Sequence, residues 1–295
     1  MKILVFGGSG FVGSHVADEL TERGHEVTIF DMSKSKYMRD NQKMIVGDFL
    51  DPKQVNKAVE GQDIVYNFAG IADLDAASNS PVKTIQTNVM GNLNVLEACT
   101  KSKVKRYIFA STLYVFSDKG SFYRCSKQAC ELIIEEYQKK FGLPFTILRY
   151  GSLYGKRADA SNPIYRMIKD ALEKKKIVRN GDGEELREYI NVSDAARLSA
   201  DILSEEYENE HILLSGVQKI RVKDLLSMVK EIMGNNIEIE YKPSSGNSDH
   251  YKITPFTFKP NIGKRLVSKH YKDLGEGILE CLHEQYGKKD ASDNI

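Results

Sequence analysis

The glycine-rich turn near the N-terminus constrains the fold of this chain more than any other feature. Residues 2–6 form the apolar run KILVF, and the segment GGSGFVGSH follows it directly. Its spacing, Gly7-x-x-Gly10-x-x-Gly13, gives a tight turn at Gly7, close approach of a diphosphate at Gly10, and close helix-to-sheet packing at Gly13. A strand, this turn and a helix together predict the first unit of a dinucleotide-binding domain.

Short apolar runs alternate with helical patterns through the first half of the chain. After the first run they lie at 26–30, 43–47, 63–68, 104–111 and 144–150. Strands separated by helices imply right-handed crossovers, so we expect an α/β fold with a doubly wound parallel sheet, the Rossmann arrangement.

The pattern becomes irregular after about residue 156, which indicates a smaller C-terminal α/β lid that binds substrate. We expect a Rossmann domain at 1–155 with a returning segment near 187–204, and a lid formed mainly by 156–295. The elements expected in the second half are helices near 162–175, 192–206, 221–233 and 272–286, and strands at 211–215 and 237–241.

Asp31 ends the second apolar run, about 20 residues beyond the glycines, where an acidic residue binds the adenosine ribose hydroxyls. Its charge would repel a 2′-phosphate, which favours NAD over NADP. The alternative is that Asp31 only starts a turn. Phe11 and Val12, which open the following helix, are assigned to the same cofactor site.

Three later segments offer further cofactor contacts. Asp48 and Phe49 follow the third run and are expected to border the adenine, although Asp48 is almost as well explained as a helix cap. The NFAG segment after the fourth run is expected to pass under the diphosphate, with Phe68, Ala69 and Gly70 as its contacts. Asn88 either faces solvent or orients the chain near the nicotinamide.

Two Tyr-x-x-x-Lys matches occur, Tyr123 with Lys127 and Tyr165 with Lys169, and 15 tyrosines are enough to give one or two by chance. A tyrosine that acts as a base near pH 7 needs its pKa lowered by about 3 units, or about 4 kcal/mol. A lysine one helical turn away supplies about 4 kcal/mol at a separation of about 4 Å. Spacing alone does not choose between the two pairs.

Composition excludes several function classes. A net charge of +1 with mixed signs along the chain gives no electrostatic footprint for nucleic acid or a membrane surface. The four cysteines and six histidines show no metal-ligand spacing, so we expect no metal, and we expect all four thiols to be buried. Without a signal peptide or an apolar run of membrane-spanning length, the expected location is the cytoplasm.

Motifs in a fixed order carry a resemblance to a known family. They are GGSGFVG, Asp31, GDF at 47–49, NFAG at 67–70, TNVMGN at 87–92, AST at 110–112, YRCSK at 123–127, ILRYGSLYG at 147–155 and GDGEELREYINVSDAA at 181–196. The chain resembles the extended short-chain dehydrogenase/reductases, specifically the NAD-dependent nucleotide-sugar epimerase/dehydratase family that includes UDP-glucose 4-epimerase.

The resemblance implies roles for the residues that match. Thr112, at the end of the fifth strand, would hydrogen-bond the sugar hydroxyl that is oxidised, and Tyr123 would take its proton. Lys127 would lower the pKa of Tyr123 and bind the nicotinamide ribose, and Tyr150 would border the cofactor. Tyr165 has no such strand before it, so Tyr123 and Lys127 are the expected catalytic pair.

Departures from the family pattern narrow the expected reaction. Leu113 and Tyr114 stand where the family's 4,6-dehydratases have an acid/base pair, and the segment 113–122 contains no cysteine for epimerisation at C3 or C5. Hydride chemistry at C4 remains. The same segment is shorter than usual in the family, which predicts a site that is either more open or completed by another element.

The substrate side is matched less completely. The family's asparagine near the diphosphate is replaced by Ser152, and Arg187 matches the arginine that holds a phosphate, unless it pairs on the surface with Glu184 or Glu188. The second arginine of the lid is not recognisable. Lys252 is a candidate for its place.

These inferences predict NAD-dependent oxidation at C4 of a nucleotide-diphosphate sugar, by a 4-epimerase or a 4-dehydrogenase that gives a 4-keto sugar. The alternatives are a 4-reductase and a non-catalytic NAD-binding sensor. In the family, helices corresponding to about 83–101 and 123–140 pair into a four-helix bundle, so a homodimer is expected. The apolar residues that suggest it are Leu93, Val95, Leu96, Leu132, Ile133 and Ile134.

Overall fold

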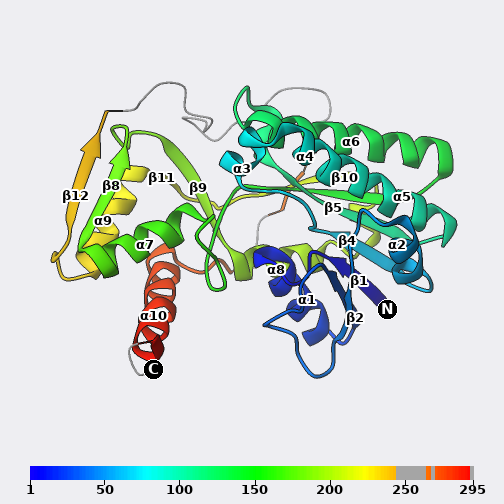
Figure 1. The fold of residues 1–295 in the computed structure, drawn as a ribbon, viewed down its shortest axis with the longest axis horizontal. Helices are drawn as coiled ribbons and strands as arrows, with labels where there is room; N and C mark the ends of the chain where they lie inside the picture. The colour runs from blue at the N-terminus through cyan, green and yellow to red at the C-terminus, as the bar shows by residue number, and fades with distance from the viewer. Residues whose placement is uncertain (244–263, 267–269, 293–295) are drawn as a thin grey trace.

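The computed structural model describes residues 1–243, 264–266 and 270–292. Its main sheet has eight strands in the order β13-β10-β6-β5-β4-β1-β2-β3, and all neighbouring pairs are parallel (Figure 1). The strands are β1 (Lys2–Phe6), β2 (Glu26–Asp31), β3 (Lys43–Val46), β4 (Ile64–Asn67), β5 (Arg106–Thr112), β6 (Phe145–Tyr150), β10 (Glu210–Leu214) and β13 (Lys264–Arg265).

Helices cover both faces of this sheet, as parallel strands with helical crossovers require. Figure 1 shows α5 and α6 on one face and α1 and α8 on the other. The first face carries α2 (Pro52–Val59), α3 (Leu74–Asn79), α4 (Pro81–Ile85), the π-helical turn η1 (Gln86–Met90), α5 (Gly91–Lys101) and α6 (Ser121–Phe141). The second carries α1 (Phe11–Glu22) and α8 (Val192–Asp201). A separate apolar core lies beneath each layer.

A smaller lid stands at one end of the sheet, seen to the left in Figure 1. It contains a three-stranded sheet, a two-stranded sheet and three helices around a third apolar core. Its strands are β7 (Ser152–Tyr154), β8 (Lys176–Asn180), β9 (Leu186–Asn191), β11 (Lys219–Arg221) and β12 (Glu238–Lys242), and its helices are α7 (Pro163–Lys174), α9 (Val222–Ile232) and α10 (Leu274–Ser292).

Local sequence signals explain several helix ends. The Asp51 side chain accepts from the N–H groups of Lys53 and Gln54, and Pro52 fills the first position of α2. Asn162 caps α7 in the same way. Gly142 adopts a left-handed φ of 69° at the end of α6, the usual C-terminal stop.

The predicted fold class is confirmed, and the six predicted strands of the first half coincide with β1 to β6 within a few residues. One placement was wrong. The run at 211–215, expected in the lid, forms β10 of the main sheet, where it pairs with β6 and is buried on both faces. The helix expected at 192–206 ends at Asp201 and is followed by a 3₁₀ turn, η3 (Glu205–Tyr207).

The structure shows which of the four cysteines are buried. Cys99, Cys130 and Cys281 are buried, but Cys125 is exposed, contrary to expectation, because it lies on the outer face of α6. Across residues 1–243, 264–266 and 270–292 no group of three side chains is arranged to hold a metal ion. None of the helices in these ranges combines the length and apolar composition of a membrane span.

Candidate active site

The glycine turn forms a tight cradle between β1 and α1. A side chain at Gly13 would lie 2.3 Å from the Gly7 carbonyl oxygen, and Gly7 itself has φ +73°. Gly10 begins α1 without a side-chain cap, and the first turn of the helix carries no acidic residue. The free N–H groups and the positive end of the helix dipole therefore suit a diphosphate. Phe11 and Val12 are half-buried in the first turn.

Asp31 is fixed beside this cradle. Its carboxylate accepts a hydrogen bond from the Ser9 N–H at 3.0 Å and one from the Ser33 N–H at 3.3 Å. A carboxylate oxygen has two lone pairs, so both oxygens retain capacity to accept from ribose hydroxyls. The cradle and this carboxylate fit a dinucleotide whose adenosine ribose lacks a 2′-phosphate.

The segments after β3 and β4 adjoin the same edge of the sheet. Asp48 accepts from the Leu50 N–H at 2.9 Å and so forms a turn, while the cap of α2 is Asp51. Phe49 is buried. The ring of Phe68 lies 6.2 Å from that of Tyr150. Asn67 accepts from the Ala69 N–H at 3.1 Å, which fixes the course of the NFAG segment.

Asn88 lies inside the π-helical turn η1 and is buried, which excludes the solvent-facing alternative. Its side chain accepts from the Ile71 N–H at 2.7 Å and donates to the Ile71 carbonyl and the Ser126 hydroxyl. A side chain on Gly70 would lie 2.7 Å from the Asn88 Oδ1. Asn88 therefore anchors the segment that follows NFAG. Such π-turns often occur at functional sites.

Ser126 was missed by the sequence analysis although it stands inside YRCSK. It donates to the Tyr123 carbonyl at 2.8 Å and accepts from Asn88, and so links α6 to η1. The available signal was a small polar residue directly before Lys127 in the YRCSK motif.

Thr112, Tyr123 and Lys127 come together at the carboxyl end of β5. The Thr112 side chain lies close enough to the Tyr123 phenol to lower its pKa. The Lys127 Nζ lies 5.9 Å from the centre of the Tyr123 ring and donates to the Ala110 carbonyl at 2.7 Å. The expected pair therefore lies on one face of α6, against the strand that carries Thr112.

The pKa values of this pair differ from the simple expectation. Burial raises the pKa of Tyr123 to about 12, and the Thr112 side chain offsets only part of this increase. Burial also lowers the pKa of Lys127 to about 8. Within the chain alone, the ammonium is thus too far from the phenol to make Tyr123 a base near pH 7.

The short segment between Thr112 and Tyr123 is an ordered turn. A 3₁₀ helix, η2 (Leu113–Phe116), brings the Tyr114 ring edge-on to the Tyr123 ring, with centres 6.3 Å apart. A side chain at Gly120, where φ is +96°, would lie 2.7 Å from the Tyr114 ring. Tyr114 therefore forms a wall beside the Tyr123 phenol.

Tyr150 and the described residues predicted to bind substrate lie on several different strands. Ser152 is half-buried in β7, and Arg187 is buried in β9. Glu184 pairs with Lys223 and Arg221. Lys252 lies outside the described residues. The Tyr150 phenol reaches the Ser199 hydroxyl at 2.6 Å, which places that side chain in the core rather than at an open surface.

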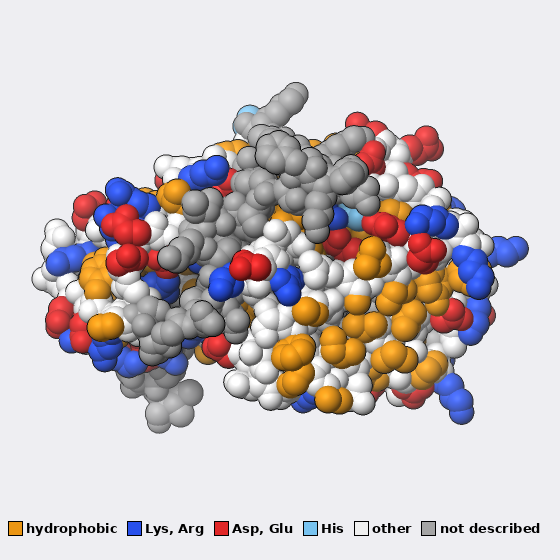
Figure 2. Space-filling view, turned by 90° about the horizontal axis from the view of Figure 1, so that it is seen from above, with side chains coloured by type: hydrophobic (Ala, Val, Ile, Leu, Met, Phe, Trp, Pro, Cys, Tyr) orange, Lys and Arg blue, Asp and Glu red, His pale blue; other side chains and the backbone are white. Residues whose placement is uncertain are grey.

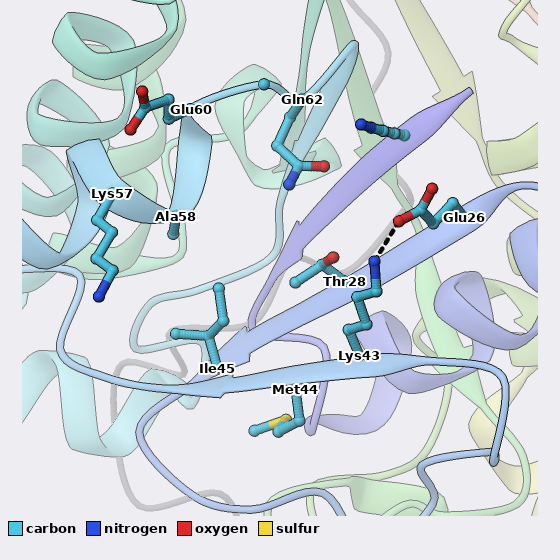
Figure 3. A pocket seen from close by; sticks show the side chains of 11 residues that line it. Glu26, Thr28, Lys43, Met44, Ile45, Lys57, Ala58, Glu60 and Gln62 are labelled. Atoms are coloured by element: carbon cyan, nitrogen blue, oxygen red, sulfur yellow. Dashed lines mark hydrogen bonds and ion pairs between the residues drawn. The ribbon is translucent and has the colours of Figure 1, made fainter.

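A hollow of about 560 Å³ is lined by none of these residues. Figure 3 shows the side chains that line it. It is lined by the first residues of three strands, including Lys2, Glu26 and Lys43, and an ion pair joins Lys43 to Glu26. Ligands of open α/β sheets bind outside the carboxyl ends of the strands. This hollow lies at the amino ends of the strands, so it is not where a ligand of such a sheet is expected. We therefore place the candidate active site at the opposite edge of the sheet, where the carboxyl ends of the strands lie.

Comparison with known proteins agrees with this geometry. Residues 3–214 match the NAD dependent epimerase/dehydratase family. A UDP-N-acetyl-α-D-glucosaminuronate decarboxylase of Bacillus cytotoxicus is 31% identical over 89% of this chain and 90% of its own length. A putative UDP-glucose 4-epimerase of Methanocaldococcus jannaschii is 28% identical over 95% of this chain and 97% of its own.

Solved structures are similar over nearly the whole length. The UDP-glucose 4-epimerase of Thermotoga maritima, determined with UDP-glucose, has a TM-score of 0.83 and 25% identity, and covers 98% of this chain and 100% of its own. The UDP-glucuronic acid 4-epimerase of Bacillus cereus, determined with UDP-glucuronic acid and NAD, has a TM-score of 0.85 and 24% identity over the same shares.

Proposed function

This chain belongs to the NAD dependent epimerase/dehydratase family, and from that premise we propose that it oxidises C4 of a nucleotide-diphosphate sugar. The observation that carries the proposal is the meeting of Thr112, Tyr123 and Lys127 at the carboxyl end of β5. NAD is the cofactor of the family, and when bound it accepts the hydride.

The side chains have distinct roles in this proposal. The Thr112 hydroxyl holds the C4 hydroxyl of the sugar, and the Tyr123 oxygen takes its proton while the C4–H bond breaks and C4 becomes a carbonyl carbon. Lys127 favours the ionised phenol by its charge and contacts the nicotinamide ribose. Asn88 keeps the segment after NFAG in place. Ser152, Arg187 and Lys252 remain candidates for the diphosphate.

The fate of the 4-keto sugar determines which reaction the enzyme completes. Return of the hydride to the other face of C4 gives a 4-epimerase, and release gives a 4-dehydrogenase. Elimination of water is not favoured, because Leu113 and Tyr114 occupy the places of its acid and base. A 4-reductase would run the same step in reverse. An NAD-binding sensor would need no Tyr123 and Lys127 pair.

A second candidate is oxidative decarboxylation of a nucleotide-linked uronic acid. It is favoured by the 31% identity with the Bacillus cytotoxicus decarboxylase over most of both chains. The chemistry begins with the same step, because a ketone at C4 is β to a carboxylate on C5, and such an acid loses CO₂ readily. Tyr123 and Thr112 keep the roles given above.

A product panel tests the proposal. The protein is incubated with UDP-glucose, UDP-N-acetylglucosamine and UDP-glucuronic acid, with and without added NAD, and the products are separated and weighed by mass spectrometry. A separable isomer indicates epimerisation, a loss of two hydrogens a 4-keto product, and a loss of CO₂ decarboxylation. Loss of water alone, or NAD binding without any product from a wider panel, would contradict the proposal.

The assembly proposed for the enzyme is a homodimer through the helical layer that contains α5 and α6. Figure 2 shows hydrophobic side chains gathered on this half of the molecule. Exposed members on α4, η1 and α6 are Val82, Ile85, Met90, Phe122, Leu132 and Phe141. Of the residues that suggested a dimer, Leu132 is exposed, whereas Val95, Leu96 and Ile134 lie in the core of the same chain. An apolar surface of this kind marks a contact with another chain.

A further inference from the structure

A buried ion pair ties α6 to the strands behind the catalytic residues. The side chains of Glu131 and Arg149 are only 8% and 5% exposed. Arg149 donates to the two Glu131 oxygens at 3.0 Å and 2.6 Å. The Ser111 hydroxyl donates to the same carboxylate at 2.5 Å. The carboxylate therefore joins one helix to two neighbouring strands.

These three residues adjoin the catalytic ones in the sequence. Glu131 lies one helical turn after Lys127, so their side chains share a face of α6. Ser111 directly precedes Thr112 in β5, and it is the register partner of Arg149 in β6. The pair is thus positioned to fix α6 against the end of β5.

The same unit also contacts the short segment beside the active site. The Arg149 guanidinium carbon lies 4.7 Å from the centre of the Phe116 ring in η2. On α6, the Gln128 side chain donates to the Val115 carbonyl at 2.9 Å. Because η2 carries Tyr114, these contacts hold the wall beside the Tyr123 phenol.

Stability alone does not explain a pair of this kind. Removing two charges from water costs several kcal/mol per ion, and apolar residues of similar volume are often as stable or more stable in the same place. A fully hydrogen-bonded carboxylate and guanidinium do, however, specify one relative position of the elements that carry them.

Several titratable groups surround the buried pair. His211 in β10 accepts from Arg149 through Nδ1 at 2.7 Å, so its other nitrogen donates to Glu135 at 3.0 Å and the ring is neutral. Burial and Arg149 lower the pKa of His211 to about 4. Burial lowers the pKa of Lys127, and the carboxylate of Glu131, one helical turn away, opposes that effect. Burial keeps Cys130 a neutral thiol.

We propose that Glu131 and Arg149 are positioning residues for the catalytic pair: they hold α6 against β5 so that Tyr123 meets Thr112 and Lys127 stays beside it. This inference rests on the proposed roles of Tyr123 and Lys127. It adds two buried residues and Ser111 to the set that determines activity, although none of them touches substrate.

The ionisation of Tyr123 provides a test that needs no substrate. Tyrosinate absorbance is titrated in protein saturated with NAD, and the curve of Tyr123→Phe is subtracted. In the double variant Glu131→Leu/Arg149→Met, apolar groups of similar volume replace the pair. We expect it to keep its fold, while the apparent pKa of Tyr123 rises by about 1 unit or more because α6 shifts and the Lys127 ammonium no longer lies beside the phenol.

Arg106→Met is the matched control, because Arg106 is also buried in β5 and paired with an acid, Glu208, but at the opposite end of the strand. It should lower thermal stability without moving the Tyr123 titration. A normal Tyr123 titration in the double variant overturns the inference. If circular dichroism shows that the double variant does not fold, Ser111→Ala decides in its place, with an upward shift expected and an unchanged curve contradicting it. Absence of the ionisation in the wild-type NAD complex overturns the proposed function instead, and the inference with it.

Discussion

The ionisation of Tyr123 can be predicted quantitatively from the geometry. Burial places the pKa of this phenol at about 12. The Lys127 Nζ lies 5.9 Å from the centre of the Tyr123 ring, and a unit charge about 6 Å away, with an effective dielectric near 20, contributes about 3 kcal/mol, or about 2 pKa units. The nicotinamide ring of oxidised NAD would bring a second positive charge, which lowers the pKa further. Together the two charges are expected to bring the apparent pKa below about 10 in the NAD complex.

Two variants separate these contributions. Tyr123→Phe should abolish the titration and lower turnover by about 10²-fold or more, with NAD binding nearly intact. Lys127→Met should raise the apparent pKa of Tyr123 by about 2 units and also weaken NAD binding. The equivalent changes at the other sequence match, Tyr165→Phe and Lys169→Met, are controls on α7 and should be nearly neutral.

The pH dependence has a definite sign. The pKa of Lys127 is lowered to about 8, so its charge is present below that pH and is lost as the pH rises through it. Activity should therefore rise as Tyr123 ionises and fall as Lys127 loses its proton. The reasoning would be refuted if no tyrosine titrates below about pH 10 in the NAD complex, or if Tyr123→Phe leaves the titration unchanged.

Three further outcomes follow from other parts of the structure. Calorimetry should show tighter binding of NAD than of NADP, and Asp31→Ala should narrow the difference; equal affinities in the wild type would contradict the role given to Asp31. Light scattering at micromolar concentration should give a dimer, and Leu132→Asp should give a folded monomer; a monomeric wild type would exclude the proposed interface. Gly13→Ala should weaken NAD binding by about tenfold or more, because its methyl group would meet the Gly7 carbonyl oxygen at 2.3 Å; unchanged affinity would show that the cradle adapts.

Much of the fold follows from local sequence signals. The strands of the first half are short apolar runs bounded by glycine and polar residues. The spacing of the glycines that begins at Gly7 predicts the geometry of the turn. The place of β10 was not predictable in this way, because a short apolar run does not say which sheet it joins. Pairing with β6 depends on the return of the chain through α8, a contact between distant segments.

The candidate site, too, was predicted from the sequence only in part. Thr112, Tyr123 and Lys127 were found through spacing and the resemblance, but the 5.9 Å separation and the contact of Lys127 with Ala110 depend on packing. Glu131 and Arg149 carry no signal of their own, since an ion pair between a helix and a strand is visible only after folding. The exposure of Cys125 is likewise set by which face of α6 turns outward.

The most direct test of the central claim uses UDP-sugars deuterated at one carbon. The protein with bound NAD is mixed with UDP-glucose or UDP-glucuronic acid carrying deuterium at C4, and the reduced cofactor is followed in a single turnover. Oxidation at C4 predicts that deuterium appears on the nicotinamide and that cofactor reduction is slower than with the unlabelled sugar. Cofactor reduction that takes its deuterium from a sugar labelled at C3 or C5, and none from C4, would contradict the account.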